Sequence, residues 1–303
     1  MLNDIVKPLT EWYRQNKRSL PWRDRHNAYY TWVSEIMLQQ TRVEAVKPYF
    51  QRFIRELPDV ASLAAAPEER IVKLWEGLGY YSRVRNMQKA AIRVMEEYNG
   101  KIPEDFETLL SLKGIGRYTA GAISSIAYGH KVPAVDGVYS RLTESREDIM
   151  KQSVRKSVEE QLKEIMPEDR PGDFNQAMME IGAVVCVPNG KAKCEECPLG
   201  RFCLARKHGT VEELPVKAPK KARTQDNRTV FIIQDGECTA IRKRPEKGLL
   251  AGLYELPNTQ GHLKSEDALL YVKELGLDPL YIEELPPAKH IFSHIEWRMQ
   301  AYR

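Results

Sequence analysis

The sequence of 303 residues predicts a mainly α-helical domain followed by a smaller α+β domain. Three observations lead to this fold class. Apolar side chains recur at helical spacing through most of residues 1–205, four cysteines close that stretch, and alternating patterns typical of strands follow. We therefore expect a helical domain over residues 1–205, with a cysteine loop at 186–203, a linker over 206–227 and an α+β domain over 228–303.

The net charge and the lack of long apolar segments limit the kinds of partner that we expect for this chain. The net charge is +4, with basic residues clustered locally, as at Arg83 and Arg85. Such a surface fits nucleic acid without requiring it. The N-terminus lacks the apolar core of a signal peptide, and no segment has the length of a membrane span. We expect a soluble, cytoplasmic, nucleoid-associated monomer without a membrane partner.

Helical patterns dominate the first domain. In residues 30–46, Val33, Ile36 and Met37 form an apolar stripe, and Glu35 lies beside it. Burial of a glutamate raises its pKa, which makes a general acid that works near neutral pH. An ordinary surface glutamate is the alternative. The other expected helices are one ending at residues 9–13 and those at 67–76, 82–98, 119–127, 154–166 and 174–185.

Residues 109–141 form the stretch around which we expect the first domain to be organised. Gly114-Ile115-Gly116 separates two short helices, and glycine accepts the positive φ of a tight hairpin. The exposed N–H groups of the second helix are suited to a phosphate. Asp136 follows in an apolar run. An ordinary helix corner and a helix-capping aspartate are the alternatives.

Two other features have open interpretations. In Gly77-Leu78-Gly79-Tyr80-Tyr81, an aromatic tip on a glycine-rich loop can wedge between bases or simply pack a corner. The spacing Cys186-x7-Cys194-x2-Cys197-x5-Cys203 leaves zinc and iron–sulfur both open, with iron–sulfur favoured because only one close pair is present. We expect Cys238 to be a buried apolar side chain.

The α+β pattern contains two strands, 228–233 and 238–243, about an Asp235-Gly236 turn. A helix at 265–275 and a strand at 290–297 follow. The sequence ends at Arg303, and we expect this domain to be incomplete and poorly stable.

These motifs together resemble the adenine DNA glycosylases of the helix-hairpin-helix, or endonuclease III-like, glycosylase superfamily. The resemblance runs from Trp12 to Cys203 and continues into the C-terminal portion. It is carried by Leu20-Pro21-Trp22-Arg23, Ser34-Glu35-Ile36-Met37-Leu38-Gln39-Gln40-Thr41, Gly77-Leu78-Gly79-Tyr80-Tyr81-Ser82-Arg83, Gly114-Ile115-Gly116-Arg117-Tyr118-Thr119-Ala120-Gly121-Ala122-Ile123 and the four cysteines.

The resemblance implies base-excision repair of double-stranded DNA in which adenine is mispaired with 8-oxoguanine or guanine, after the adenine is swung out of the helix. Glu35 matches the acid that protonates the leaving base, and Asp136 matches the carboxylate that stabilises the cationic sugar. Tyr118 stands where strand-cutting relatives carry a lysine, which implies a monofunctional glycosylase. Cys186, Cys194, Cys197 and Cys203 match the ligands of a [4Fe–4S] cluster.

The resemblance also implies the DNA contacts. Gln40 and Tyr80 match residues that fill the vacated stack, and the expected contacts include Gln39, Thr41, Arg83, Gly114 and Gly116. The C-terminal portion resembles the family's Nudix-like domain but lacks the acidic helix of Nudix hydrolases, so pyrophosphatase activity is not expected. Phe292-Ser293-His294 matches the loop that recognises 8-oxoguanine, with Ser293 and His294 as binding residues.

One departure from the family pattern concerns catalysis. After Asp136 the sequence is about four residues short, roughly one helical turn, and an expected asparagine is missing. One alternative is therefore a lesion-binding protein with impaired catalysis. A bifunctional, endonuclease III-like glycosylase is a further alternative, which Tyr118 and the Nudix-like portion disfavour.

Overall fold

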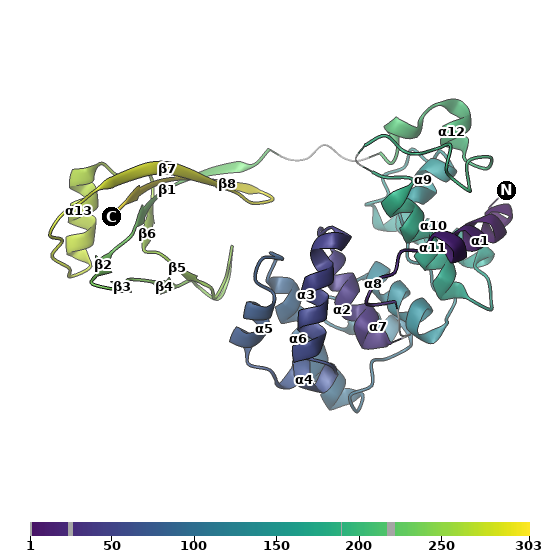
Figure 1. The fold of residues 1–303 in the computed structure, drawn as a ribbon, viewed down its shortest axis with the longest axis horizontal. Helices are drawn as coiled ribbons and strands as arrows, with labels where there is room; N and C mark the ends of the chain where they lie inside the picture. The colour runs from purple at the N-terminus through teal and green to yellow at the C-terminus, as the bar shows by residue number, and fades with distance from the viewer. Residues whose placement is uncertain (1, 24–26, 189, 217–221) are drawn as a thin grey trace. The chain divides into compact units, whose positions relative to one another are not determined.

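The structure is a computed structural model that describes residues 2–23, 27–188, 190–216 and 222–303. Its chain divides into two compact units, Met1–Ala218 and Pro219–Arg303 (Figure 1). The predicted linker of residues 206–227 contains this boundary. It also contains the end of one helix and the start of one strand.

The first unit is helical, as predicted, and its helices form two packed groups. Trp32, Phe53 and Trp75 lie in the core of the group that runs from α2 to α8, and Leu9 and Phe174 lie in the core that joins α1, α9, α10 and α11. The elements are η1 (Asn3–Ile5), α1 (Val6–Asn16), α2 (Ala28–Leu38), α3 (Val43–Glu56), α4 (Val60–Ala65), α5 (Glu68–Leu74), α6 (Ser82–Glu97), α7 (Phe106–Ser111), α8 (Arg117–Ala122), the π-helical η2 (Ile123–Ala127), α9 (Val138–Leu142), α10 (Gln152–Ile165), α11 (Pro171–Val184), α12 (Leu204–His208) and η3 (Val211–Glu213).

The single helix predicted over residues 30–46 was wrong. The structure breaks it after Leu38 and starts α3 at Val43. Gln40 takes a φ of 60°, in the left-handed region, which a right-handed helix cannot contain. The break leaves Gln39, Gln40 and Thr41 on a turn at the C-terminal end of the helix that carries Glu35.

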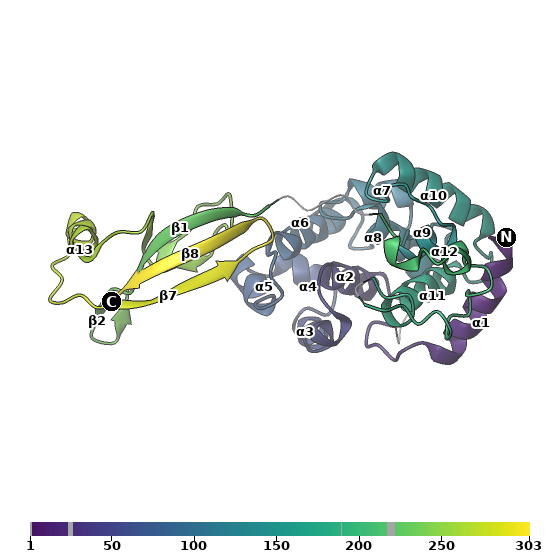
Figure 2. The same cartoon turned by 90° about the horizontal axis from the view of Figure 1, so that it is seen from above.

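The second unit is α+β, as predicted, and contains a four-stranded sheet in the order β6-β1-β8-β7. Strands β1 and β8 are parallel, the other neighbours are antiparallel, and β1, β8 and β7 run side by side (Figure 2). Phe231 and Tyr302 pack with Ala268 and Val272 of α13. The elements are β1 (Thr224–Phe231), β2 (Gln234–Asp235), β3 (Cys238–Thr239), β4 (Arg242–Lys243), β5 (Tyr254–Glu255), β6 (Asn258–Gln260), α13 (Ser265–Glu274), β7 (Glu284–Ile291) and β8 (Ile295–Tyr302).

Three local predictions in this unit were wrong. The strand expected at 238–243 is split between β3 and β4, which belong to different sheets. The strand expected at 290–297 is interrupted by the turn between β7 and β8. The prediction missed this turn because the residues on both sides of it alternate as in a single strand. Cys238 lies exposed on the two-residue strand β3 and is not buried.

Within the part of the chain that the structure describes, every helix is too short or too polar to cross a membrane.

Candidate active site

Glu35 lies on α2 in a largely apolar environment. Asn27 caps this helix, its side chain accepting the Tyr30 N–H at 3.1 Å, and residues on both sides of the helix are buried. As a result only 9 % of Glu35 is exposed. The prediction of a desolvated carboxyl is confirmed.

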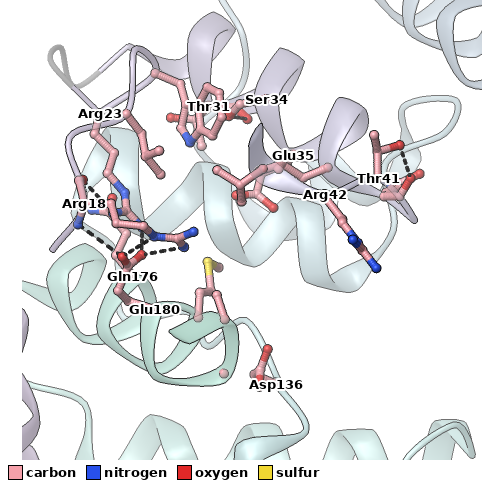
Figure 3. Close-up of a pocket in the computed structure, with 18 of the residues that line it drawn as sticks. Arg18, Arg23, Thr31, Ser34, Glu35, Thr41, Arg42, Asp136, Gln176 and Glu180 are labelled. Carbon is pink, nitrogen blue, oxygen red and sulfur yellow. Dashed lines mark hydrogen bonds and ion pairs between the residues drawn. The ribbon is translucent and has the colours of Figure 1, made fainter. Parts of the chain in front are cut away.

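Glu35 opens into a cavity of about 870 Å³ whose lining includes Tyr118 and Asp136 (Figure 3). In the close-up Glu35 projects from α2, and Asp136 lies across the cavity beside α11. Gln39 and Thr41 also line the cavity. The three residues predicted to be catalytic come from separate segments, and the fold brings all of them to one cavity.

Burial is the largest influence on the pKa values of Glu35, Asp136 and Tyr118 in this cavity. Desolvation raises the pKa of Glu35 to about 7, while the positive charge of Arg23 opposes the shift. Burial also raises the pKa of Asp136, against a backbone hydrogen bond that lowers it. The pKa of Tyr118 lies well above its usual value, because of burial first and then the charges of Glu35 and Asp136. A neutral phenol thus lines the same cavity as two carboxyl groups whose pKa values burial raises.

The short segment after Asp136 still places this residue at the cavity. Asp136 Oδ1 accepts the Val138 N–H at 3.0 Å, and α9 begins at once and extends only to Leu142. Gly182 of α11 makes room for the carboxylate, because a Cβ on that glycine would lie 2.9 Å from Asp136 Oδ1. Asp136 thus lies at the cavity although the segment that follows it is short.

Asn175 of α11 fixes the chain that leads into Asp136. Its side-chain NH₂ donates to Ser125 Oγ of η2 at 2.7 Å and to the Val132 carbonyl at 2.9 Å. Its side-chain oxygen accepts the Ala134 N–H at 3.0 Å. Both ends of the segment around Asp136 are thus tied by hydrogen bonds. Sequence reasoning missed Asn175 and Gly182, because they matter only through the contact of α11 with that segment.

A buried ion triad at the same cavity was also missed. The side chain of Glu180 is fully buried on α11, and its Oε1 and Oε2 accept Arg18 Nε at 2.6 Å and Arg23 Nη2 at 2.7 Å (Figure 3). A buried carboxylate is tolerated when cations and hydrogen bonds satisfy it. The triad attaches the segment before α2 to α11. The only sequence signal was the Leu-Pro-Trp-Arg string that contains Arg23.

Two loops of the first unit hold strained residues, and Gln39 and Thr41 of one of them line the cavity. Gln40 and Tyr80 are non-glycine residues with φ of 60° and 48°. Such conformations are uncommon and are concentrated at functional sites. Half of Tyr80 is exposed (49 %), which favours an exposed aromatic tip over corner packing.

Arg83 joins these two loops. Its Nη1 donates to the carbonyls of Ile36 and Gln39, both at 2.7 Å, and its Nη2 donates to Leu78 and Gly79 at 3.0 and 3.1 Å. The guanidinium that we predicted as a DNA contact thus makes several backbone hydrogen bonds within the protein.

The Gly-x-Gly hairpin is confirmed. Gly114 has a φ of 83° and lies between α7 and α8, and Gly116 is the cap residue from which α8 starts. Ser293 and His294 belong to the second unit, where they lie exposed on the turn between β7 and β8.

The four cysteines gather around one small pocket of the first unit. Arg141 Nη1 lies 3.2 Å from Cys186 Sγ, and Cys203 Sγ lies 3.3 Å from the Arg141 carbonyl. Burial raises the pKa of Cys197 to about 11. Among the described residues, no group of three or more His, Cys, Asp or Glu side chains is arranged to hold a single metal ion. Four thiols around one pocket are a donor set that fits a four-iron cluster, in which each cysteine binds a different iron atom.

Comparison with known proteins agrees with this geometry. Residues 33–168 match the sequence model of the HhH-GPD superfamily base excision DNA repair proteins, and residues 229–303 match that of the NUDIX domain. A thermostable thymine-DNA glycosylase superposes with a TM-score of 0.60 at 25% identity, covering 68% of this chain and 96% of its own. Endonuclease III in a non-covalent DNA complex gives 0.57 at 25% identity, covering 69% of this chain and 98% of its own. The fold and the cavity thus define a DNA-binding base-excision repair protein.

Curated relatives specify the family within that class. The human adenine DNA glycosylase is 36% identical over 97% of this chain, and the one from Buchnera aphidicola (subsp. Acyrthosiphon pisum) is 35% identical over 93%. This chain spans 65% of the human protein's length and 81% of the Buchnera protein's. The chain belongs to the adenine DNA glycosylase family. The predicted family and class of function are confirmed.

Proposed function

We propose that this chain hydrolyses the N-glycosidic bond of adenine mispaired with 8-oxoguanine or guanine in duplex DNA. The observation that supports it most strongly is the cavity that Glu35 and Asp136 share. Its volume of about 870 Å³ lies within the range of small-molecule sites, so an adenine that has been swung out of the helix fits it.

The two carboxyl groups have different roles in this reaction. Glu35, whose pKa is about 7, donates a proton to the adenine as the bond between base and sugar breaks. Asp136, in its ionised form, stabilises the positive charge that develops on the sugar. Adenine leaves in neutral form, water adds to the cationic sugar and gives its proton back to the Glu35 carboxylate, and an abasic site remains. The comparisons and the cavity give no support to a lesion-binding protein without catalysis.

Tyr118 determines which product forms. A lysine at this position could attack the sugar and form a Schiff base, but a buried phenol of raised pKa carries no amine. The DNA strand therefore stays intact after excision. This distinguishes the proposed activity from that of a bifunctional, endonuclease III-like enzyme.

We infer that Cys186, Cys194, Cys197 and Cys203 hold a [4Fe–4S] cluster, whose chemistry here is structural. The thiols and Arg141 would keep residues 186–203 packed against α9 and α11. We also infer that Ser293 and His294 contact the base opposite adenine and that the chain acts as a monomer.

Product analysis tests the proposed function. A duplex with one 8-oxoguanine·adenine pair is incubated with the protein and divided into samples with and without alkali. We expect free adenine in both samples and strand breaks only in the sample treated with alkali. We expect no borohydride-trapped protein–DNA adduct. Strand breaks without alkali, together with a trapped adduct, would show a bifunctional enzyme instead.

A further inference from the structure

The sheet of the second unit has two faces of different character. Side chains alternate between the faces of a strand, and Phe231 and Tyr302 face α13. Trp297 of β8 therefore lies on the opposite face, where it is paired across strands with His290 of β7. Arg228 of β1 also lies on this face.

Trp297 is the centre of a cation–aromatic cluster on this second face. The guanidinium carbons of Arg228 and Arg244 lie 4.9 and 5.3 Å from the centre of its ring. Arg228 is itself held by Asp226 and Asn258, at 2.9 and 2.8 Å. Anchored guanidinium groups over an indole give a site of fixed geometry, because each contact restricts the ring further.

Phe292 connects this cluster to the turn between β7 and β8, which carries Ser293 and His294. The Phe292 ring packs edge-on against Trp297, with ring centres 5.0 Å apart and an angle of 73°. The His290 ring also packs against Phe292, with ring centres 4.5 Å apart. The Phe292 backbone is also fixed, because its N–H donates to the Ile295 carbonyl at 2.8 Å and its carbonyl accepts Arg223 Nε at 3.2 Å.

We propose that Trp297 is a positioning residue for opposite-base specificity, which acts by packing Phe292 so that Ser293 and His294 present their polar groups in one arrangement. This inference rests on the proposed function. Phe292 is anchored through both its ring and its backbone, and it leads directly into the exposed residues Ser293 and His294. Trp297 itself contacts no DNA in this account.

The test compares single-turnover rates on two duplexes that differ only in 8-oxoguanine or guanine opposite adenine. We expect the ratio of the two rates to fall about five- to tenfold in Trp297→Leu, which corresponds to losing about one hydrogen bond to the lesion. Tyr281→Leu removes an exposed aromatic side chain (65 % exposed) from the same unit and should leave the ratio unchanged. Trp297→Phe keeps an aromatic ring at this position and should retain most of the wild-type ratio.

A double-mutant cycle makes the test independent of general destabilisation. Phe292→Ala truncates the contact from the turn side, so it should lower the ratio alone, and Trp297→Leu should add little to it. Thermal melting identifies any variant that has unfolded, and Phe292→Ala then decides the outcome. An unchanged ratio in folded Trp297→Leu, or additive losses, would overturn the inference alone. A wild-type chain without preference for 8-oxoguanine would overturn the assigned opposite base and this inference with it.

Discussion

At the scale of single residues, the proposed reaction requires two carboxyl groups of one cavity to act in different protonation states. Glu35 must be protonated, and burial favours its protonated form. Asp136 must be ionised, and the Val138 N–H favours its charged form against burial. Both residues are buried, and the positive charge of Arg23 opposes protonation of Glu35, so the feature that favours ionisation of Asp136 is its backbone hydrogen bond with Val138.

The pH dependence of excision follows from these two groups. The single-turnover rate should fall above about pH 7, because Glu35 loses its proton as the pH rises through its pKa. The rate should also fall at acid pH. Because the pKa of Asp136 is raised, this fall should begin at a pH above the usual pKa range of aspartate. Rates measured across pH on a preformed complex give both limbs. A rate that stays flat from pH 6 to pH 9 would exclude Glu35 as the acid.

Gly182 tests how closely α11 and Asp136 must approach. In Gly182→Ala the new Cβ would lie 2.9 Å from Asp136 Oδ1, so the carboxylate must move. We expect the single-turnover rate to fall by about tenfold to a hundredfold, with little change in DNA affinity. Gly137→Ala is the matched control, since its φ is −63° and its Cβ would meet only Pro215 at 3.6 Å. Equal rates for both variants would contradict this role of Gly182.

At the scale of elements, the first unit brings two strained turns together with a single guanidinium. Arg83 starts from α6 and donates to carbonyls at the end of α2 and in the loop that carries Tyr80. A lysine has one ammonium group and cannot span both loops with the same geometry. Arg83 thus stabilises the position of Gln40 and Tyr80 relative to each other.

Arg83→Lys should therefore loosen both turns and lower the excision rate about tenfold while the helices stay folded. Fluorescence of 2-aminopurine in place of the target adenine reports whether the base still leaves the stack. Arg85→Lys is the control, because the Arg85 guanidinium makes an ion pair with exposed Glu68. Base flipping unchanged in Arg83→Lys would mean that the turns do not need this guanidinium.

Helical periodicity was sufficient to predict most helices of the first unit, because their apolar stripes face two large cores. It did not show the break at Gln40, since apolar spacing carries no signal for a backbone with positive φ. The candidate site divides in the same way. Glu35, Tyr118 and Asp136 lie in recognisable motifs, whereas Glu180, Asn175 and Gly182 act through contacts of α11 that only the folded chain makes.

At the scale of the whole molecule, each unit has a core of its own. The first unit holds two apolar cores and the cysteine pocket, and the second holds a small core of four buried residues around Phe231. We therefore expect a change in one unit to leave the unfolding temperature of the other unit unchanged.

Cys197→Ser should remove iron from the protein and lower the unfolding temperature of the first unit only, because metal binding contributes to folding of the part that holds it. Iron content, visible absorption and a calorimetric scan measure both effects. Cys238→Ser, at the exposed cysteine of the second unit, is the control and should retain iron. A variant Cys197→Ser with full iron content would contradict the proposed ligand set.

The most direct test of the account is the single-turnover rate of adenine release by the wild-type chain and by Asp136→Asn. The account predicts that the wild type excises adenine despite its short segment after Asp136. It also predicts that the variant is slower by about a hundredfold to a thousandfold with similar DNA affinity, because a fixed charge at the sugar is lost. Tight binding without excision by the wild type, or equal rates for both proteins, would contradict the central claim that Asp136 remains a working partner of Glu35.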